Sequence, residues 1–360
     1  MVSEENALAN IRKYAVRHFQ GHPESVWHKL PISRRSSVFV LLFLGHLGEL
    51  RVILTKRSRK LRSFPGHISL PGGKADDGLE LEWHVARREM EEEIGLSANN
   101  DLLLKNYGFT IDHLNILPSY LSRTFSAVRP CIGFMNFRSN VDSELFSQLK
   151  LNLNPGESSS IFSCPLKDFL YPISEEESLE SLERSSYRIK WGGIPWNLRS
   201  YTFLQSNENE APWLKDIVDL SATEEEDEIS DIDEEEKRSV TPPPTEAHKF
   251  KHKRQKNLSA WGRLGSRRHV ETNEKIYDVW GLTANILHDL ADVAYRGPPE
   301  REIGEEELIY AIWKYGNQMK TKKRSEAEVK LIESKTAGDY GFGEILPRVE
   351  FNKLKQIYKL

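Results

Sequence analysis

One stretch of the sequence decides the fold: Arg88-Glu89-Met90-Glu91-Glu92-Glu93-Ile94-Gly95. On an α-helix, residues three and four positions apart share a face, so Glu89, Glu92 and Glu93 gather on one side. Three neighbouring carboxylates repel one another unless a divalent cation neutralises them, and hard oxygen ligands suit Mg²⁺ or Mn²⁺. We therefore predict a helix over about residues 81–94, ended by Gly95, with these three glutamates as metal ligands.

The residues around this stretch fit the same interpretation. Arg88 lies four positions before Glu92 and can orient its carboxylate, as a partner behind a metal ligand does. Gly72 and Gly73 let the backbone come close to a ligand where a Cβ atom would obstruct it, within a loop predicted over residues 66–78. The alternative is a solvated helix face, which is how Glu91 is expected to lie and how most such charged helices are used.

Length and composition set the broad class. The chain has 360 residues, 38% hydrophobic and 29% charged, with a net charge of -4, which suits one domain with long additions or two modest domains. Only two cysteines occur, Cys131 and Cys164, so we expect a reducing compartment and no disulfide framework. The run Val38 to Leu44 is too short to span a bilayer, and the acidic start lacks a secretory layout. We expect a soluble, intracellular protein without membrane association.

Hydrophobic patterning gives a coarse order of elements. A helix is expected over about residues 4–20, and a hairpin of two strands over 36–44 and 50–56. Further extended segments are expected at 107–111, 126–135, 161–165, 187–191 and 200–204, with a short helix at 166–170. A strand-to-helix segment is expected from 277 to about 294, and a charged helical stretch over 304–335.

The composition changes sharply in the second half. From Glu224 to Glu236, ten of thirteen residues are acidic, and from Lys249 to Arg268, eight of twenty are basic. So little apolar surface cannot offset the entropy of ordering the backbone, so residues 206–270 are predicted to be disordered. The basic segment 249–268 could bind nucleic acid or protein, but the adjacent acidic tract can pair with it. We favour a self-compensating insertion and expect nucleic acid not to be a partner.

The helix and its surroundings resemble the signature of the Nudix hydrolase family, G-x5-E-x7-R-E-U-x-E-E-x-G-U with U aliphatic. The second half of this pattern is complete and is formed by Arg88, Glu89, Met90, Glu92, Glu93, Gly95 and Leu96. The first half departs, because Gly73 lies sixteen residues before Glu89 where the pattern has fifteen. Counting back from Arg88 places Glu80 at the upstream acidic position, which implies one extra residue in the loop.

This longer spacing resembles the coenzyme A diphosphatase branch of the family. The branch signature is matched upstream at Leu54-Thr55-Lys56-Arg57-Ser58, at Leu61-Arg62 and at Pro71-Gly72-Gly73, with Leu70 replacing the usual Phe. The resemblance covers about residues 34–205 and resumes at 279–283. It implies an α/β fold, the Nudix α/β/α sandwich with a mixed sheet, interrupted by the disordered charged insertion.

The resemblance also implies a division of the chain. Residues 1–33 would be an N-terminal helical extension, 34–205 the Nudix hydrolase domain and 206–270 the acidic and basic insertion. Residues 271–298 would supply the closing helix of the domain, and 299–360 a C-terminal helical extension.

The implied reaction is attack of water on the pyrophosphate of coenzyme A or its derivatives, giving 3′,5′-ADP and 4′-phosphopantetheine. The implied cofactor is Mg²⁺ or Mn²⁺, with Arg88, Glu92 and Glu157 as catalytic residues. The general base could be Glu92, Glu93 or the loop residue Glu157, whose segment resembles one in the family that carries a Glu. A helix-start carboxylate facing the helix dipole is the alternative for Glu157.

Substrate contacts are expected from a basic segment and from the glycines. Six Lys or Arg lie between Arg51 and Arg62. Of these, Arg57 and Arg62 match the family and are expected to face the phosphates, together with Gly72 and Gly73. A substrate of another kind stays open: a Nudix housecleaning enzyme for oxidised nucleoside triphosphates or dinucleotides would use the same metal chemistry.

The chain ends in Tyr358-Lys359-Leu360, which resembles the S-K-L peroxisomal address with Tyr358 in place of Ser. The peroxisome is expected mostly from the family resemblance, with the cytoplasm as the alternative. The sequence identifies no protein partner.

Overall fold

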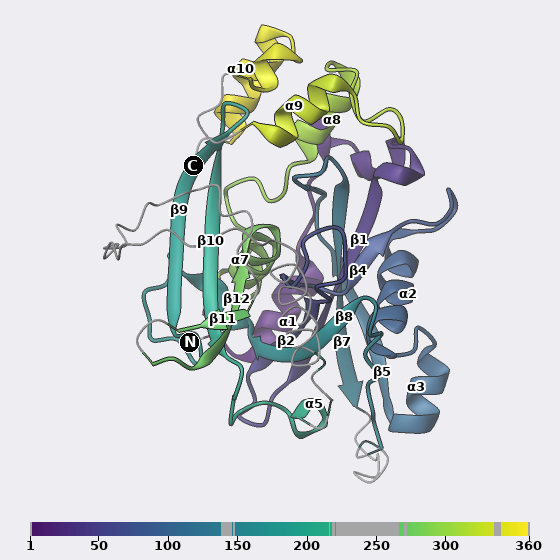
Figure 1. The fold of residues 1–360 in the computed structure, drawn as a ribbon, viewed down its shortest axis with the longest axis vertical. Helices are drawn as coiled ribbons and strands as arrows, with labels where there is room; N and C mark the ends of the chain where they lie inside the picture. Colours follow the sequence, from purple (N-terminus) through teal and green to yellow (C-terminus); the bar gives the residue numbers. More distant parts are fainter. Residues whose placement is uncertain are drawn as a thin grey trace, which may run out of the picture.

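Two β-sheets form the framework of the molecule in the computed structural model (Figure 1). The structure describes residues 2–137, 146, 148–215, 217, 220, 266–269, 272–334 and 340–358. The larger sheet has eight strands in these residues, in the order β3-β2-β1-β7-β5, with β4 beside β1, β6 beside β7 and β8 beside β2. The smaller sheet has the order β11-β12-β10-β9.

The strands of the larger sheet are β1 (Arg35–Leu44), β2 (Leu50–Arg57), β3 (Ile68–Ser69), β4 (Gly72–Lys74), β5 (Phe109–Ile116), β6 (Tyr120–Leu121), β7 (Ala127–Phe137) and β8 (Ser158–Pro165). Those of the smaller sheet are β9 (Glu183–Trp191), β10 (Ile194–Leu204), β11 (Ser266–Arg268) and β12 (Lys275–Trp280). The larger sheet is mixed, because β1 and β7 run parallel while β1 pairs antiparallel with β2 and β4.

Strand β1 shows why helices cover both faces of this sheet. Side chains alternate between faces along a strand. Phe39, Leu41 and Phe43 are buried with α2 (Glu82–Ile94) and α3 (Asn100–Tyr107) on one face. Val40 and Leu42 are buried on the other face with α1 (Glu4–Lys13) and α7 (Gly281–Arg296). The predicted α/β/α sandwich with a mixed sheet is therefore confirmed.

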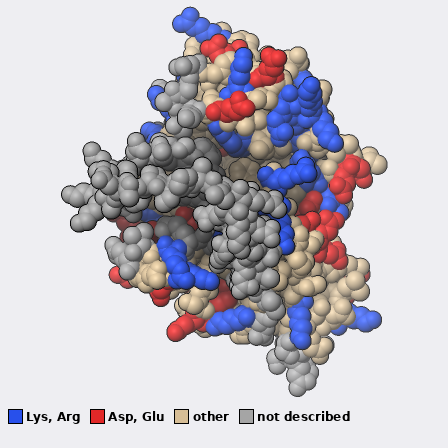
Figure 2. All heavy atoms as spheres, in the orientation of Figure 1, with Lys and Arg blue, Asp and Glu red and all other residues tan. Residues whose placement is uncertain are grey.

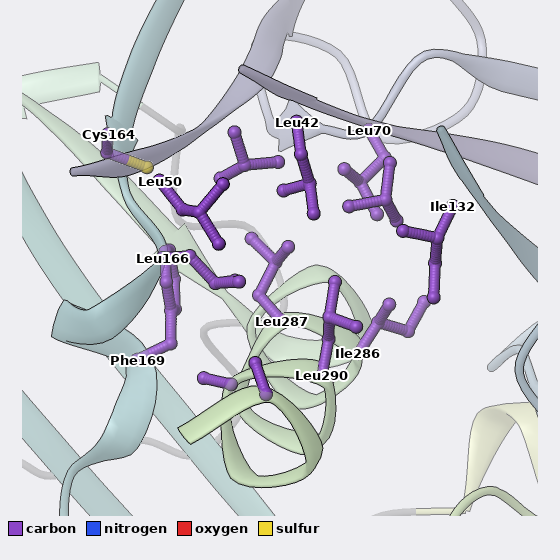
Figure 3. Packing of buried hydrophobic residues seen from close by; sticks show 14 of the residues in the cluster. Leu42, Leu50, Leu70, Ile132, Cys164, Leu166, Phe169, Ile286, Leu287 and Leu290 are labelled. Carbon is purple, nitrogen blue, oxygen red and sulfur yellow. The ribbon is translucent and has the colours of Figure 1, made fainter. Parts of the chain in front are cut away.

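Helix α7 completes the second face of the sandwich although it follows the charged tract in the sequence. Figure 3 shows Leu42 and Ile132 from the sheet facing Leu287 and Leu290 from α7, and all four are fully buried. A leucine buried in this way contributes about 1.5–3 kcal/mol relative to exposure. The core on this face of the sheet thus combines residues that precede the charged tract in the sequence with residues that follow it.

The C-terminal helices α8 (Glu306–Lys314), α9 (Glu326–Glu333) and α10 (Arg348–Ile357) form a further apolar cluster at the top of Figure 1. They pack with the one-turn helices η1 (Phe19–Gly21), η2 (Val26–Lys29) and η5 (Phe342–Glu344). Two more such turns are η3 (Ile32–Arg34) and η4 (Leu166–Leu170). Among the described helices none is long and apolar enough to cross a membrane.

Three expectations about local structure are corrected. The first helix ends at Lys13 rather than near residue 20, because Tyr14 takes an extended conformation. The loop 66–78 contains β3 and β4, since hydrogen bonding to β2 and β1 outweighs its Gly and Pro content. The stretch 304–335 is two helices, with the positive φ angles of Asn317 and Met319 between them.

The boundaries of the expected disorder are also corrected. Residues 206–215 are described and contain the short helix α5 (Pro212–Lys215), and 266–269 contain β11, which pairs with β12. The acidic tract 224–236 and most of the basic segment 249–268 lie outside the described residues.

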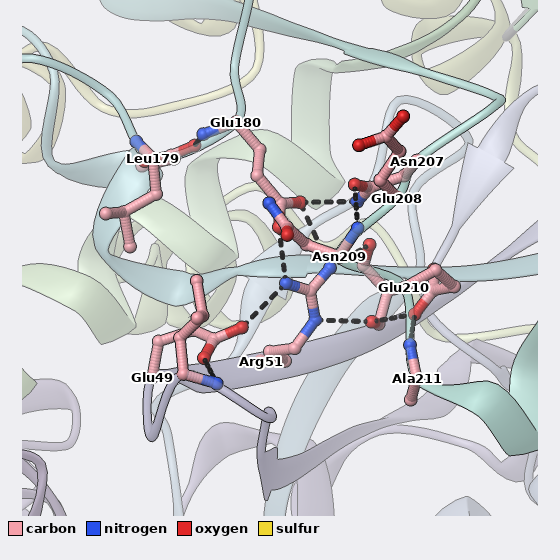
Figure 4. Close-up of polar contacts among 12 residues, drawn as sticks. Glu49, Arg51, Leu179, Glu180, Asn207, Glu208, Asn209, Glu210 and Ala211 are labelled. Carbon is pink, nitrogen blue, oxygen red and sulfur yellow. Dashed lines mark hydrogen bonds and ion pairs between the residues drawn. The ribbon is translucent and has the colours of Figure 1, made fainter.

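A buried ion cluster explains why residues 206–211 are fixed (Figure 4). The guanidinium of Arg51 is fully buried and contacts Glu49 at 2.8 Å and Glu180 at 2.6 Å. Its Nε donates to the Ser163 hydroxyl at 2.7 Å, and Glu210 accepts from the Ser163 backbone N–H at 2.7 Å. A buried charge needs such partners, so Arg51 is structural and does not face a substrate.

Candidate active site

Helix α2 presents its carboxylates at one side of the larger sheet. Its apolar face, with Val85, Met90 and Ile94, is buried against the sheet. Gly95 ends the helix with φ +74° and donates its N–H to the Glu91 carbonyl at 2.9 Å, as predicted for a C-terminal cap. Figure 2 shows acidic side chains over the region of α2 with basic side chains beside them. The sequence pattern therefore sets both the helix and the side on which its charges lie.

Glu93 is the buried carboxylate of this helix, with a side chain only 6% exposed. Its Oε1 accepts one hydrogen bond, from the Gly72 backbone N–H at 3.3 Å. Burial raises the pKa of Glu93 to about 8, and the negative charges of Glu89 and Glu157 act in the same direction, while the charge of Arg57 opposes them. The structure thus brings together a carboxylate group from α2, a loop glutamate and one arginine.

Gly72 and Gly73 lie on β4, between β1 and α2. A Cβ atom on Gly73 would overlap the carboxylate of Glu89, and one on Gly72 would overlap the Ser37 carbonyl and Val38 of β1. Gly73 is therefore required for close packing against the Glu89 carboxylate, and Gly72 for close packing against the β1 backbone. The close approach of these glycines to a ligand stays a prediction.

Arg88 holds several carboxylates at once. Its Nε donates to Glu80 at 2.8 Å and its NH1 group donates to Glu89 at 3.0 Å. The same NH1 group contacts Glu92 at 3.3 Å, and NH2 donates to the Lys74 carbonyl at 2.9 Å. Arg88 contacts Glu92 as their spacing predicts, and its contacts with Glu80 and Glu89 are closer. Glu80, the residue that counting back from Arg88 assigns to the upstream acidic position, therefore contacts Arg88 in the fold.

Glu157 is fixed beside the end of α2 by backbone hydrogen bonds. Asn154 donates its N–H to the Glu93 carbonyl at 3.0 Å, and Ser58 donates its N–H to the Glu157 carbonyl at 2.9 Å. The Oε2 atom of Glu157 is buried and accepts no hydrogen bond from the described residues. The helix-start alternative for Glu157 is wrong, because strand β8 and not a helix follows it.

The two arginines expected at the substrate differ in position. Arg57 ends β2, its charge acts on Glu93, and its Nε donates to the Ser63 carbonyl at 3.3 Å. Arg62 is exposed, and among the described residues its side chain forms no hydrogen bond or ion pair. The structure therefore brings Arg57 to the carboxylates and leaves Arg62 at the surface nearby in sequence.

The carboxylates of Glu89, Glu92, Glu93 and Glu157 are of the chemical type that binds a divalent cation, but they are not arranged as a ready metal site. Within the described part of the chain, no three His, Cys, Asp or Glu side chains are arranged as ready metal ligands. In this structure Arg88 pairs with Glu89 and Glu92, two of the three predicted ligands. Within the described residues, the buried carboxylate of Glu93 and the buried Oε2 atom of Glu157 have no ion-pair partner in contact, and hard oxygen donors of this kind suit Mg²⁺ or Mn²⁺.

Sequence reasoning missed the residues on the other side of Arg57. His67 is buried, and its backbone carbonyl accepts from the Arg57 N–H at 2.9 Å. The ring of His67 lies 5.3 Å from that of Trp280, at the end of β12. Trp280 stands in the matched closing motif, but only the fold shows that its ring contacts that of His67.

Comparisons with known proteins agree with this geometry. A family model described as the NUDIX domain matches residues 33–183. Peroxisomal coenzyme A diphosphatase 1 of Saccharomyces cerevisiae is 37% identical over 353 residues, which cover 92% of this chain and 90% of that protein. Nudix hydrolase 15 of Arabidopsis thaliana is 33% identical over 50% of this chain and 54% of its own length. Peroxisomal coenzyme A diphosphatase ndx-8 of Caenorhabditis elegans is 31% identical over 38% of this chain and 50% of its own length. The chain belongs to the Nudix hydrolase family.

Proposed function

We propose that this chain is a coenzyme A diphosphatase that uses Mg²⁺ or Mn²⁺ to cleave coenzyme A or its derivatives to 3′,5′-ADP and 4′-phosphopantetheine. The observation that carries the chemistry is the burial of Glu93 beside Glu89 and Glu157. Burying a carboxylate among like charges is costly, and a bound divalent cation offsets that cost. Nudix hydrolases typically depend on such a cation.

Each site residue then has a role in hydrolysis. Glu89, Glu92 and Glu93 would hold the cation, which when bound neutralises charge on the phosphates and activates water. Arg88 would position Glu89 and Glu92 through the contacts described above. Arg57, which lies close enough to act on Glu93, would bind a phosphate oxygen. Gly72, Gly73 and the exposed Arg62 would complete the contacts to the pyrophosphate.

The general base is proposed to be Glu157, with Glu92 or Glu93 as the alternative. The buried, unpartnered Oε2 atom of Glu157 supports this choice, because such an oxygen is available to accept a proton from water. Glu157→Gln should lower kcat while leaving KM within about threefold, and a loss of the acidic limb from the kcat profile should accompany it. A normal kcat for Glu157→Gln would move the role to α2.

The names of two relatives support coenzyme A as the substrate. Both the yeast and the nematode proteins are named coenzyme A diphosphatases, and the yeast protein matches over 90% of its length. A substrate panel with Mg²⁺ should show hydrolysis of coenzyme A at a kcat/KM well above that for 8-oxo-dGTP and for a dinucleoside polyphosphate. A preference for 8-oxo-dGTP would instead assign the chain to the housecleaning enzymes.

One catalytic domain interrupted by an insertion is proposed, with 34–205 and 271–298 as its two parts. The packing of α7 against the same sheet face as α1 supports this division. Replacing residues 221–265 with a short flexible linker should leave the kcat/KM for coenzyme A within about threefold of that of the full chain. If the full chain binds a polynucleotide and the shortened chain does not, the basic segment 249–268 would be assigned as a nucleic-acid-binding arm.

The peroxisome is the proposed location, since two of the relatives are named peroxisomal. Lys359 and Leu360, which carry the address-like ending, lie outside the described residues. Imaging an N-terminally tagged chain should show peroxisomes for the full chain and a diffuse signal after removal of these two residues. Unchanged imaging would exclude the ending as an address.

A further inference from the structure

The loop between β2 and β3 places one side chain opposite Arg57. The two strands pair Thr55 with Ser69 and Lys56 with Ile68, so the next pair in register is Arg57 with His67. Backbone hydrogen bonds continue to this point, because Arg57 donates its N–H to the His67 carbonyl at 2.9 Å. Directly opposed residues of antiparallel strands point to the same face. His67 therefore lies on the side of the sheet toward which Arg57 projects.

A row of three aromatic rings begins at His67. The ring centroids of Phe64 and His67 are 5.5 Å apart, and those of His67 and Trp280 are 5.3 Å apart. His67 is 8% exposed and is held between its two neighbours, whereas Phe64 is 39% exposed. Phe64 and His67 come from the loop after β2, while Trp280 comes from the second sheet. The row therefore joins two parts of the fold that are far apart in sequence.

Phe64 has two features that packing alone does not explain. Its φ angle is +53°, a region that residues with a Cβ rarely occupy. Its large apolar ring is nevertheless partly exposed to solvent instead of being buried by this conformation. Strained backbone conformations cluster at active sites and ligand-binding sites, and here the strain holds an aromatic ring partly exposed beside Arg57 and His67.

The row starts beside Arg57, the proposed phosphate-binding residue. The charge of Arg57 acts on Glu93 and also on His67, so Arg57 is close both to the carboxylates and to the first ring of the row. A nucleotide whose phosphates lie at Arg57 would have its base one ribose length farther on. Purine bases bind proteins largely by stacking on aromatic side chains.

We propose that Phe64, His67 and Trp280 form the subsite for the adenine base of the substrate, with the base stacking on the exposed ring of Phe64. This inference rests on the proposed function, because it takes the substrate to be an adenine nucleotide whose pyrophosphate lies at Arg57. His67 supports the Phe64 ring from behind, and Trp280 closes the far end of the row.

The first test compares two substrates in Phe64→Ala. One is coenzyme A, and the other is a symmetric pyrophosphate that carries pantetheine at both ends and no base. The KM for coenzyme A should rise roughly ten- to hundredfold, as loss of one base–aromatic stack implies, with kcat within about threefold. The KM for the base-free pyrophosphate should stay within about twofold. Phe64→Tyr, which keeps the ring, should restore the KM for coenzyme A.

The matched control is Tyr187→Ala, which removes an aromatic ring of similar exposure, 55%, from β9. It should leave both KM values unchanged. An equal rise for both substrates in Phe64→Ala would overturn the proposal and assign the ring to the pantetheine arm or to loop structure. An unchanged KM for coenzyme A would overturn it as well.

Equilibrium binding separates this inference from the proposed function. Calorimetry should show that the wild-type chain binds adenosine 3′,5′-bisphosphate at least about tenfold more tightly than a base-free ribose bisphosphate, and that Phe64→Ala removes this difference. This result would uphold the subsite even if coenzyme A were not hydrolysed. Equal binding of the two ligands by the wild-type chain would overturn the subsite whether or not coenzyme A is hydrolysed.

Discussion

Two buried glutamates, Glu93 on α2 and Glu306 on α8, show opposite uses of the same side chain. Glu93 is 6% exposed and accepts one backbone hydrogen bond, and burial raises its pKa to about 8. Glu306 is fully buried, yet it accepts hydrogen bonds from the Ser25 hydroxyl and from the backbone N–H groups of Val26 and Ser119, the latter two at 2.9 Å. Burial would raise the pKa of Glu306, but the hydrogen bonds from Ser25 and Val26, together with the His18 ring 3.7 Å away, outweigh it and lower the pKa to about 2.

The difference shows how burial of a charge separates structure from function. Glu306 is satisfied by donors from two distant segments, so its ionised form stabilises the junction of the C-terminal helices with the N-terminal part of the chain. Glu93 lacks such donors, so its ionised form opposes folding. A side chain that costs stability in a well-packed site is retained for what it binds.

Replacing Glu93 should strongly reduce hydrolysis of coenzyme A and leave the fold intact. We expect Glu93→Gln to lower kcat/KM for coenzyme A roughly 100- to 1000-fold, the range for loss of one group that stabilises reaction charge. Its unfolding free energy should be equal to or above that of the wild type at pH 7, because a carboxyl whose folded pKa is raised destabilises the fold above its unfolded pKa. Steady-state kinetics and urea unfolding measure the two effects.

The matched control for this variant is Glu91→Gln on the exposed side of the same helix. Its kcat/KM should stay within about twofold of wild type. Near-normal turnover by Glu93→Gln would remove α2 from the proposed metal site.

Replacing Glu306 should give the reverse pattern. The pKa falls from 4.5 to about 2, which at 1.36 kcal/mol per unit corresponds to about 3 kcal/mol of stability at neutral pH. Glu306→Gln should therefore lower the unfolding free energy by about this amount, measured by urea denaturation, while kcat of the folded enzyme stays unchanged. Glu344→Gln, at an exposed position in η5, should be neutral. A Glu306→Gln chain as stable as wild type would contradict a structural role.

Arg88→Lys should have a smaller effect on activity than Glu93→Gln. A single ammonium group cannot hold Glu80, Glu89 and Glu92 in the way that the planar guanidinium does. We expect a ten- to hundredfold loss of kcat/KM, the range for loss of a group behind the metal ligands, together with weaker Mg²⁺ activation. The free energy of unfolding should be nearly unchanged, because the Arg88 side chain is partly exposed. A normal Mg²⁺ dependence in Arg88→Lys would contradict the proposal that Arg88 positions the metal-binding carboxylates.

The pH dependence of stability gives the smallest effect and sharpens the comparison. Since the folded pKa of Glu306 is lowered, its contribution is fully present above about 4.5 and is lost as pH falls toward about 2. The difference in unfolding free energy between wild type and Glu306→Gln should therefore narrow steadily from pH 5 to pH 3. A difference that stays constant over this range would show that the carboxylate is not the source of the stability.

Local signals explain which parts were predictable from the sequence. Helix α2 was predicted over 81–94 and spans Glu82–Ile94, because apolar spacing and the Gly95 cap are both local. The strands β3 and β4 were missed, since their hydrogen-bond partners lie on β2 and β1, and their own composition is that of a loop. No local pattern marks Glu306 as buried either, because its donors are about 190 to 280 residues away. Residue roles set by such distant partners became visible only in the fold.

The most direct measurement is identification of the products after incubation of the wild-type chain and Glu93→Gln with coenzyme A and Mg²⁺. Mass spectrometry should show 3′,5′-ADP and 4′-phosphopantetheine in equal amounts from the wild type and almost none from Glu93→Gln, with both chains folded. Intact coenzyme A in the wild-type reaction, or equal product from both chains, would contradict hydrolysis of coenzyme A at the α2 site.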